Sequence, residues 1–330
     1  MTPAVDLPQG LTARPLHPDD VPALVTLLAA AEAVDDTGVH ESAEDLTGAW
    51  VNELVDLERD TRVVATADGE LVAWATAIAP PTFREAYGVH LQGRVHPQWR
   101  GRGIGRALLA WQLARGTELH TQRHPEAPAR LTVTAYTSMP DLAAMLRRAG
   151  LVEARWFFHQ HRSLADLPAP RTVSGVELVP FSWDRDDEVR RAHNAAFTEH
   201  YGSSERDPAS WQVMFTGQRS FRPDLSVLAV ADGAVLGYVL AYVNEANTAV
   251  LGERETYFGQ IGVLPEARGR GLSKATIVQA LRVAAEHECQ SAGLQVDSDN
   301  VSGAVGVYES LGFSTARTEV SWSRHLAPLT

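Results

Sequence analysis

The sequence predicts an α/β fold of the α+β type that occurs twice, as two tandem domains. The residues Arg-Gly-Arg-Gly stand at 100–103 and again at 268–271, each time after a strand-like run and before an apolar helix. About half of the 330-residue chain separates the two copies. Because this period is far longer than the roughly 20 to 50 residues of a solenoid unit, the repeat indicates a duplicated domain.

Each half also carries the same hairpin signal. Ala-Asp-Gly occurs at 67–69 and at 231–233, each time between two apolar runs, and Asp-Gly in this setting is a strong indication of a tight β-turn. Short first strands are expected at 11–16 and 176–181, each interrupted by a proline and followed by an acidic helix start. The same order of elements in both halves supports the duplication.

We expect a first domain at residues 1–165, a linker at 166–174 and a second domain at 175–330. The linker contains Pro168, Pro170 and small polar residues, a composition that is typical of a connection. A chain of 330 residues is long for one domain and is sufficient for two domains that each bury a core.

The net charge of −12 and the single cysteine exclude several classes of protein. An acidic surface repels phosphates, which argues against general binding of nucleic acid. Cys289 is the only cysteine, so the chain forms no internal disulfide and no metal site built on cysteines. No run approaches the roughly 20 apolar residues of a membrane span, and the first residues lack a signal-peptide pattern. We therefore expect a cytoplasmic protein without a membrane partner.

Both Arg-Gly-Arg-Gly motifs predict a loop that binds an anion. Closely spaced glycines let the backbone turn tightly and approach a ligand. The helix that follows presents its unpaired N–H groups and the positive end of its dipole at the same place, so the loop can hold a phosphate or pyrophosphate. For one copy alone, a glycine-rich turn with solvated arginines is an equal alternative. A second copy in an equivalent position argues against that alternative.

Two common phosphate-binding patterns do not fit. Neither copy has the Gly-Lys-Ser/Thr ending of a Walker A loop, and Gly101, Gly103 and Gly105 are spaced by two, unlike the dinucleotide-binding fingerprint. The pattern Arg-x-x-Gly-x-Gly/Ala that both halves carry resembles the GNAT superfamily of acyl-CoA-dependent N-acetyltransferases. The second copy departs from it at Ser273, a small residue that fits in the place of Gly or Ala.

The resemblance implies that each domain is a mixed, mainly antiparallel twisted sheet flanked by helices, with a coenzyme cleft where the fourth and fifth strands splay apart. It also implies acetyl-CoA as the cofactor, with the loop amides on its pyrophosphate. In the first domain the expected acetyl-CoA contacts are Val95, Arg100, Gly101, Arg102, Gly103, Ile104, Gly105 and Arg106. In the second domain they are Ile261, Gly262, Val263, Arg268, Gly269, Arg270, Gly271, Leu272, Ser273, Lys274 and Asn300.

A signature near the C-terminus supports the same family. Asn300, Ala304, Tyr308, Gly312 and Phe313 match the family's Asn-x3-Ala-x3-Tyr-x3-Gly-Phe pattern. By this resemblance Tyr308 is the general acid that protonates the departing thiolate. The alternative is a tyrosine that only packs on the apolar face of an amphipathic helix.

The two halves differ at this signature. Counted back from Gly150-Leu151, the partner of Gly312-Phe313, the first half has Leu146 in the place of Tyr308. We therefore expect the second domain to be catalytic and the first domain to bind acetyl-CoA structurally.

The reaction that the resemblance implies is direct attack of a primary amine on the acetyl thioester. The amine must first lose a proton, which requires a base or a water relay. Family members often use a glutamate at the fourth strand, and Glu255 is our candidate, with Tyr257 or an ordered water as alternatives. A solvated acid in the loop before the strand is an equally good interpretation of Glu255. His193 and His200 lie in the expected substrate segment, where packing or surface roles are more common.

The sequence does not identify the acceptor, because variable loops build the acceptor site in this superfamily. A small-molecule amine and a protein amine both remain open, the acidic balance favours a cationic acceptor, and a monomer and a homodimer are both open. The tandem layout also resembles the mycothiol synthase family, which makes acetylation of a cysteinyl-pseudodisaccharide amine an alternative, although Tyr257 lies near the position of that family's glutamate. A non-catalytic acetyl-CoA-binding regulatory module is a further alternative, against which the retained Tyr308 argues.

Overall fold

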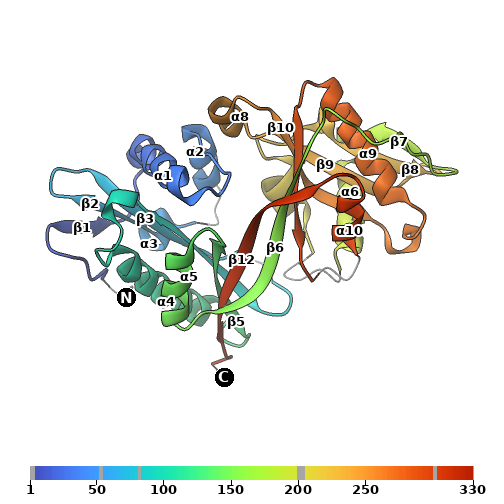
Figure 1. The fold of residues 1–330 in the computed structure, drawn as a ribbon. Coiled ribbons are helices and arrows are strands. Elements are labelled where there is room, and N and C mark those ends of the chain that lie inside the picture. Colours follow the sequence, from blue (N-terminus) through green and yellow to red (C-terminus); the bar gives the residue numbers. More distant parts are fainter. Residues whose placement is uncertain (1–3, 52–54, 81–82, 199–204, 300–302, 330) are drawn as a thin grey trace. The chain divides into compact units, whose positions relative to one another are not determined.

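The computed structural model describes residues 4–51, 55–80, 83–198, 205–299 and 303–329. They form two compact units (Figure 1). The first unit consists of Met1–Trp156 together with Glu319–Thr330, and the second unit consists of Phe157–Thr318.

The first unit contains a mixed sheet in the order β1-β2-β3-β4-β5-β12. Its neighbouring strands are antiparallel except for β4 and β5, which are parallel. The hairpin turn predicted at 67–69 connects β2 and β3. The strands of this sheet are β1 (Leu11–Arg14), β2 (Thr61–Thr66), β3 (Leu71–Ile78), β4 (Tyr87–Val95), β5 (Ala129–Tyr136) and β12 (Ser314–Leu326).

Helices cover both faces of this sheet. Successive strand residues point to opposite sides, so neighbouring residues pack against different helices. Val63 of β2 packs in the cluster with α1, and the next residue, Val64, packs in the cluster with α4. The helices of the first unit are η1 (Pro18–Asp20), α1 (Val21–Asp35), α2 (Ala43–Val51), α3 (Leu57–Asp60), η2 (Pro97–Trp99), α4 (Ile104–Arg123) and α5 (Pro140–Arg148).

The second unit repeats this arrangement with the order β6-β11-β10-β9-β8-β7. Here β10 and β11 are the parallel pair, and the other neighbours are antiparallel. The turn predicted at 231–233 connects β8 and β9. The strands are β6 (Val152–Ser163), β7 (Glu177–Pro180), β8 (Val227–Ala231), β9 (Ala234–Tyr242), β10 (Glu255–Val263) and β11 (Ser291–Asp297).

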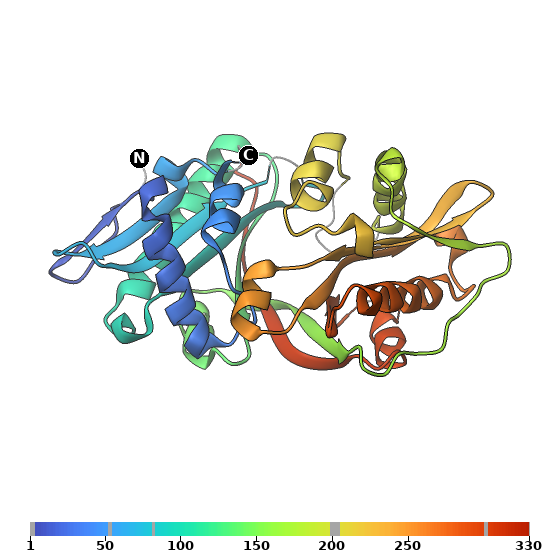
Figure 2. The same ribbon diagram turned by 90° about the horizontal axis from the view of Figure 1, so that it is seen from above.

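Helices again lie on both faces. Figure 2 shows α9, in orange, on one side of the second sheet and α6, in yellow-green, on the other side. In the part of the chain that the structure describes, no helix is both long and apolar enough to span a bilayer. The helices of the second unit are η3 (Trp183–Arg185), α6 (Asp186–Ala196), α7 (Pro208–Trp211), the π-helical turn η4 (Gln212–Thr216), η5 (Pro223–Leu225), α8 (Glu245–Leu251), η6 (Pro265–Ala267), α9 (Leu272–Glu286) and α10 (Ala304–Glu309).

The last strand of each half of the sequence completes the sheet of the other unit. Residues 157–163 of β6 pair with 291–297 of β11, and residues 319–326 of β12 pair with 129–136 of β5. The compact units therefore divide near 156 and 318, and not at the boundaries 1–165 and 175–330 expected from the repeat. The repeat marks which segments were duplicated, but it does not determine which sheet the final strand of each copy joins.

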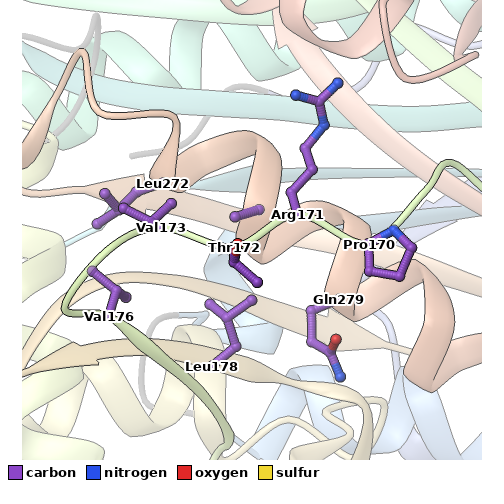
Figure 3. Close-up of a pocket in the computed structure, with 9 residues that line it drawn as sticks. Pro170, Arg171, Thr172, Val173, Val176, Leu178, Leu272 and Gln279 are labelled. Atoms are coloured by element: carbon purple, nitrogen blue, oxygen red, sulfur yellow. The ribbon is translucent and has the colours of Figure 1, made fainter.

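The segment 166–174, expected as a linker, lies against α9 within the second unit. Arg282 donates a hydrogen bond to the carbonyl of Pro168, at 3.0 Å, and Arg270 donates one to the carbonyl of Ser174, at 3.4 Å. A cavity of about 210 Å³ lies beside this segment (Figure 3). Its lining is mostly apolar and consists of Pro170, Arg171, Thr172, Val173, Val176, Leu178, Leu272, Ala275 and Gln279. Of the expected coenzyme residues it includes Leu272, the first residue of α9.

Candidate active site

The parallel strands of each unit separate towards their carboxyl ends. β10 and β11 pair from Glu255↔Ser291 to Tyr257↔Gly293, although β10 continues to Val263. In the first unit, the pairing of β4 with β5 likewise ends before β4 does. Beyond these pairs the facing strand edges are open to an extended ligand, whose amides can bond to them as an added strand would. This is the splayed cleft that the sequence resemblance implies, and it occurs in both units.

A glycine-rich turn leads from each of these strands into a helix. Gly269 and Gly271 have φ angles of +76° and +82°, and Gly101 and Gly103 have φ angles of +75° and +88°. Left-handed backbone of this kind favours glycine. Gly271 and Gly103 are the N-caps of α9 and α4 and offer no side chain to the first amides of the helix. These amides are therefore available to an anion, and the backbone of both loops fits a pyrophosphate.

The first arginine of each loop braces the loop against its own unit. The Arg268 Nε donates to the carbonyl of Val263 at 3.4 Å, and its Nη2 donates to the carbonyl of Ala196 at the end of α6, at 3.0 Å. The Arg100 guanidinium instead forms two hydrogen bonds to the Asp35 carboxylate, at 2.7 and 2.9 Å. The sequence assigned both side chains to the phosphates. In this structure the positive charge of Arg100 already has a carboxylate partner within the first unit.

Tyr308 lies on α10 in the core on the α9 side of the sheet. Its side chain is 8% exposed and meets Phe313 edge-on, with ring centroids 6.2 Å apart. Burial raises the pKa of the Tyr308 phenol to about 12, so the hydroxyl keeps its proton at neutral pH. A protonated phenol can act as a proton donor.

The counterpart of Tyr308 in the first unit is Leu146, as the sequence alignment predicts. The carbonyl of Tyr308 accepts a hydrogen bond from the Phe313 amide at 3.1 Å, and the carbonyl of Leu146 accepts one from the Leu151 amide at 3.1 Å. The two helix ends therefore have the same geometry. Leu146 is completely buried and offers no proton.

A β-bulge distinguishes β10 from β4. The register of β10 with β9 shifts between Phe258 and Gln260, so Gly259 is an additional residue on β10. The register of β4 with β3 runs from Ile78↔His90 to Ala73↔Val95 without a shift. An extra residue reverses the alternation of side chains on the part of the strand before it.

The reversal brings Glu255 and Tyr257 to the face opposite α9. Phe258 packs in the core with α9 and α10, and Tyr257 packs with the cluster on the other face. In the first unit, the residues 168 positions earlier are Tyr87 and Val89, which are fully buried in the core with α4 and α5. The second unit therefore presents a carboxylate where the first unit has a buried aromatic ring.

Glu255 is half-buried at the start of β10, and burial raises the pKa of its carboxyl. His161 of β6 opposes this effect, since its Nε2 lies 3.6 Å from the Glu255 Oε2. Glu253, 3.9 Å from the same imidazole, raises the pKa of Glu255, and Arg317 and His159 lower it. The sequence pointed to Glu255 but missed His161, because β6 belongs to the other half of the repeat.

Other residues from the sequence analysis have different roles or lie outside the described part. His193 is buried, its Nδ1 is 2.8 Å from the Tyr238 hydroxyl, and its ring stacks on Phe197, so it is a packing residue of the α6 face. Asn300 and His200 lie outside the described residues.

Two splayed clefts, each with a glycine-rich anion loop at a helix start, define a protein with tandem acyl-coenzyme A-binding acetyltransferase folds. The family model described as the acetyltransferase (GNAT) family matches residues 29–128 and 187–313. The chain therefore belongs to the GNAT acetyltransferase family.

Relatives match most of the chain. A mycothiol acetyltransferase from Frankia alni is 32% identical and covers 95% of this chain and 94% of its own length. One from Saccharomonospora viridis is 34% identical over 70% of this chain and 72% of its own length. These relatives and the family match establish an acetyl-CoA-dependent N-acetyltransferase.

Solved structures share the tandem arrangement. A GCN5-related N-acetyltransferase from Sphaerobacter thermophilus has a TM-score of 0.78 and 25% identity, and the match covers 98% of both chains. A tandem GNAT protein from the clavulanic acid biosynthesis pathway has a TM-score of 0.71 and 24% identity, covering 96% of this chain and 99% of that chain. The second likeness concerns the fold alone.

Proposed function

We propose that the second unit transfers the acetyl group to a primary amine of a small molecule, and that the first unit binds acetyl-CoA without turnover. The observation that carries this proposal is the bulge at Gly259, which brings Glu255 out of the α9 core and onto the face where an acceptor can reach it. The first unit lacks the bulge, and it has the buried Tyr87 in the place of Glu255 and Leu146 in the place of Tyr308.

The residues that would hold acetyl-CoA are those of the loop and of the open edge of β10. Gly269 to Lys274 would bind the pyrophosphate through their amides, and Ile261 to Val263 would line the pantetheine. When bound, acetyl-CoA supplies the activated acetyl group. The corresponding assignment in the first unit rests on the glycines 101 and 103, which have the same left-handed backbone.

In this proposal Glu255 and Tyr308, on opposite faces of the second sheet, have opposite roles in proton transfer. The Glu255 carboxylate takes a proton from the acceptor ammonium, and the amine that results has the free electron pair that an attack requires. The Tyr308 hydroxyl holds its proton well above neutral pH and donates it as the transfer completes.

The acceptor is a small-molecule amine in this proposal because several relatives that cover most of the chain are named mycothiol acetyltransferase. Their names make acetylation of a mycothiol-related amine the second candidate. The acidic pair Glu253 and Glu255 favours an acceptor that arrives as an ammonium ion.

A panel of amines tests the proposal, with coenzyme A release as the readout. The panel contains spermidine, glucosamine, kanamycin, cysteine methyl ester and a peptide with a free N-terminus. We expect Tyr308→Phe to lower kcat roughly 100-fold on any accepted amine, since proton transfer contributes on the order of 10² to 10⁴ in rate.

The matched control is Tyr87→Phe, which removes one buried hydroxyl from the first unit, where Arg123 contacts it at 3.4 Å. This variant should retain the wild-type rate. Unchanged turnover in Tyr308→Phe together with a loss in Tyr87→Phe would assign the reaction to the first unit. Binding of acetyl-CoA without turnover of any amine or of a mycothiol precursor would favour the regulatory module.

A further inference from the structure

His161 contacts Glu255, with its Nε2 3.6 Å from the Glu255 Oε2, and it comes from the strand that the first half of the sequence contributes. β6 pairs with β11 so that His161 lies directly opposite Gly293, and β10 pairs with β11 so that Tyr257 lies opposite the same glycine. Side chains of directly paired residues point to the same face. The imidazole and the Glu255 carboxylate therefore approach each other over Gly293 from the two neighbouring strands.

Gly293 is the space that allows this approach. A Cβ at position 293 would lie 2.9 Å from the Glu255 Oε1, and its three nearest atoms would all belong to the Glu255 carboxyl group. Gly293 is not among the glycines with positive φ, so its backbone does not require glycine. Because Gly293 has no side chain, the Glu255 carboxylate can lie across β11 and reach the imidazole on β6.

The charges around this group come from several elements. Glu253 lies before β10, with an oxygen 3.9 Å from the His161 Nε2. His159 of β6 lies two pairs along the strand and contacts Gln295, and Arg317 of β12 also acts on Glu255. The His161 side chain is 42% exposed, so a proton on its imidazole can pass to water.

We propose that His161 is a positioning residue for Glu255 and relays its proton to solvent. This proposal rests on the proposed function, in which Glu255 deprotonates the acceptor. An N–H bond of the acceptor ammonium breaks as an O–H bond forms on the Glu255 carboxyl. That O–H bond then breaks as an N–H bond forms at His161 Nε2, and the exposed imidazolium releases the proton to water. Each step is a proton transfer, and no oxidation state changes.

The relay gives the strand from the other half of the sequence a chemical role in the second unit. An imidazole nitrogen can accept a proton from a carboxylic acid and pass it to water. With β6 in place, Glu255 has a neighbouring imidazole that can take its proton after each turnover. The chemical partner of the base is thus supplied by the strand exchange.

The test is the pH dependence of kcat/KM for the panel amine with the highest rate, in wild type and in His161→Gln. His161 lowers the pKa of Glu255, so its removal raises that pKa, and a base with a raised pKa needs a higher pH to ionise. We expect the acidic limb of the profile to move to higher pH, and kcat to fall roughly 10-fold, which is less than the 10²- to 10⁴-fold that a direct general acid or base contributes. Added imidazole should restore part of kcat.

Gly293→Ala is the second variant, and it should shift the acidic limb in the same direction by separating the carboxylate from the imidazole. His325→Gln, on the exposed end of β12 in the first unit, is the matched control and should leave the profile unchanged. Acetyl-CoA titration confirms that each variant is folded. If Glu255→Gln abolishes turnover while His161→Gln and Gly293→Ala leave the profile unchanged, the relay is wrong. If Glu255→Gln itself is fully active, Glu255 is not the base, and the relay fails together with that assignment.

Discussion

The Tyr308 hydroxyl illustrates how one buried group links stability to chemistry. Its pKa rises from an ordinary value of 10 to about 12 because the surrounding core disfavours the phenolate. The unfolded chain releases the proton near pH 10, whereas the folded chain holds it to about pH 12. The protonated phenol therefore contributes stability that is complete below pH 10 and is lost as the pH rises to about 12.

The difference in the Tyr308 pKa between the folded and the unfolded chain should be measurable by urea unfolding at pH 8 and pH 11. Wild type should lose about 1 kcal/mol more between these two pH values than Tyr308→Phe does, because the variant has no phenol to ionise. Tyr238 and Tyr242, whose pKa values burial also raises, contribute equally to both proteins and cancel. An equal loss in wild type and variant would contradict the buried, protonated Tyr308.

Single residues were predictable where their signal is local in the sequence. The glycines at 269 and 271 are recognisable from their spacing, and the pair Tyr308 and Leu146 from the resemblance to the family's C-terminal signature, since a loop and a helix end are built from consecutive residues. His161 could not be found in this way. Its neighbour Glu255 is 94 positions further along the chain, and the contact depends on which sheet β6 joins.

At the scale of elements, the bulge in β10 decides which side chains face the acceptor. The sequence Phe258-Gly259-Gln260 reads as a continuous strand, because alternation is too short here to show an inserted residue. The structure supplies the reason for the glycine: a Cβ at 259 would lie 2.6 Å from the ring of Tyr242 on β9. The Tyr242 hydroxyl also hydrogen-bonds to the Gln260 Oε1 at 2.8 Å. Tyr242 thus contacts Gly259 through its ring and Gln260 through its hydroxyl.

Gly259→Ala should therefore disturb the bulge. The new methyl group must displace the buried Tyr242 ring, and overpacking of this kind costs about 1 to 3 kcal/mol of unfolding free energy. We expect a lower thermal midpoint and a reduced transfer rate, with acetyl-CoA still bound at the loop. Gly48→Ala on α2 is the matched control, because a Cβ there meets no atom within 4 Å, and alanine favours a helix. Wild-type stability and rate in Gly259→Ala would show that the bulge tolerates a side chain.

At the scale of the whole molecule, the duplication was predictable and the exchange of final strands was not. Repeated loops and hairpin turns reveal two copies of one fold, since each copy keeps its local signals. A strand carries no local signal for the sheet edge that it will join, because β6 and β12 offer the same backbone groups to either partner. The expected boundaries 1–165 and 175–330 follow the repeat in the sequence, while the units Met1–Trp156 with Glu319–Thr330 and Phe157–Thr318 follow the packing of the chain.

Because the final strands β6 and β12 are exchanged, the stability of a truncated chain should depend on which of these strands it keeps. A fragment 175–330 lacks β6, so the edge of β11 that pairs with residues 157–163 is left open. Open edges of this kind favour aggregation, and the fragment also loses His161. We expect 175–330 to aggregate or to unfold at a lower temperature than a fragment 157–318, which keeps β6. Size-exclusion chromatography, circular dichroism and acetyl-CoA titration distinguish the two fragments. A monomeric 175–330 fragment that binds acetyl-CoA as tightly as the full chain would mean that the second sheet does not need the exchanged strand.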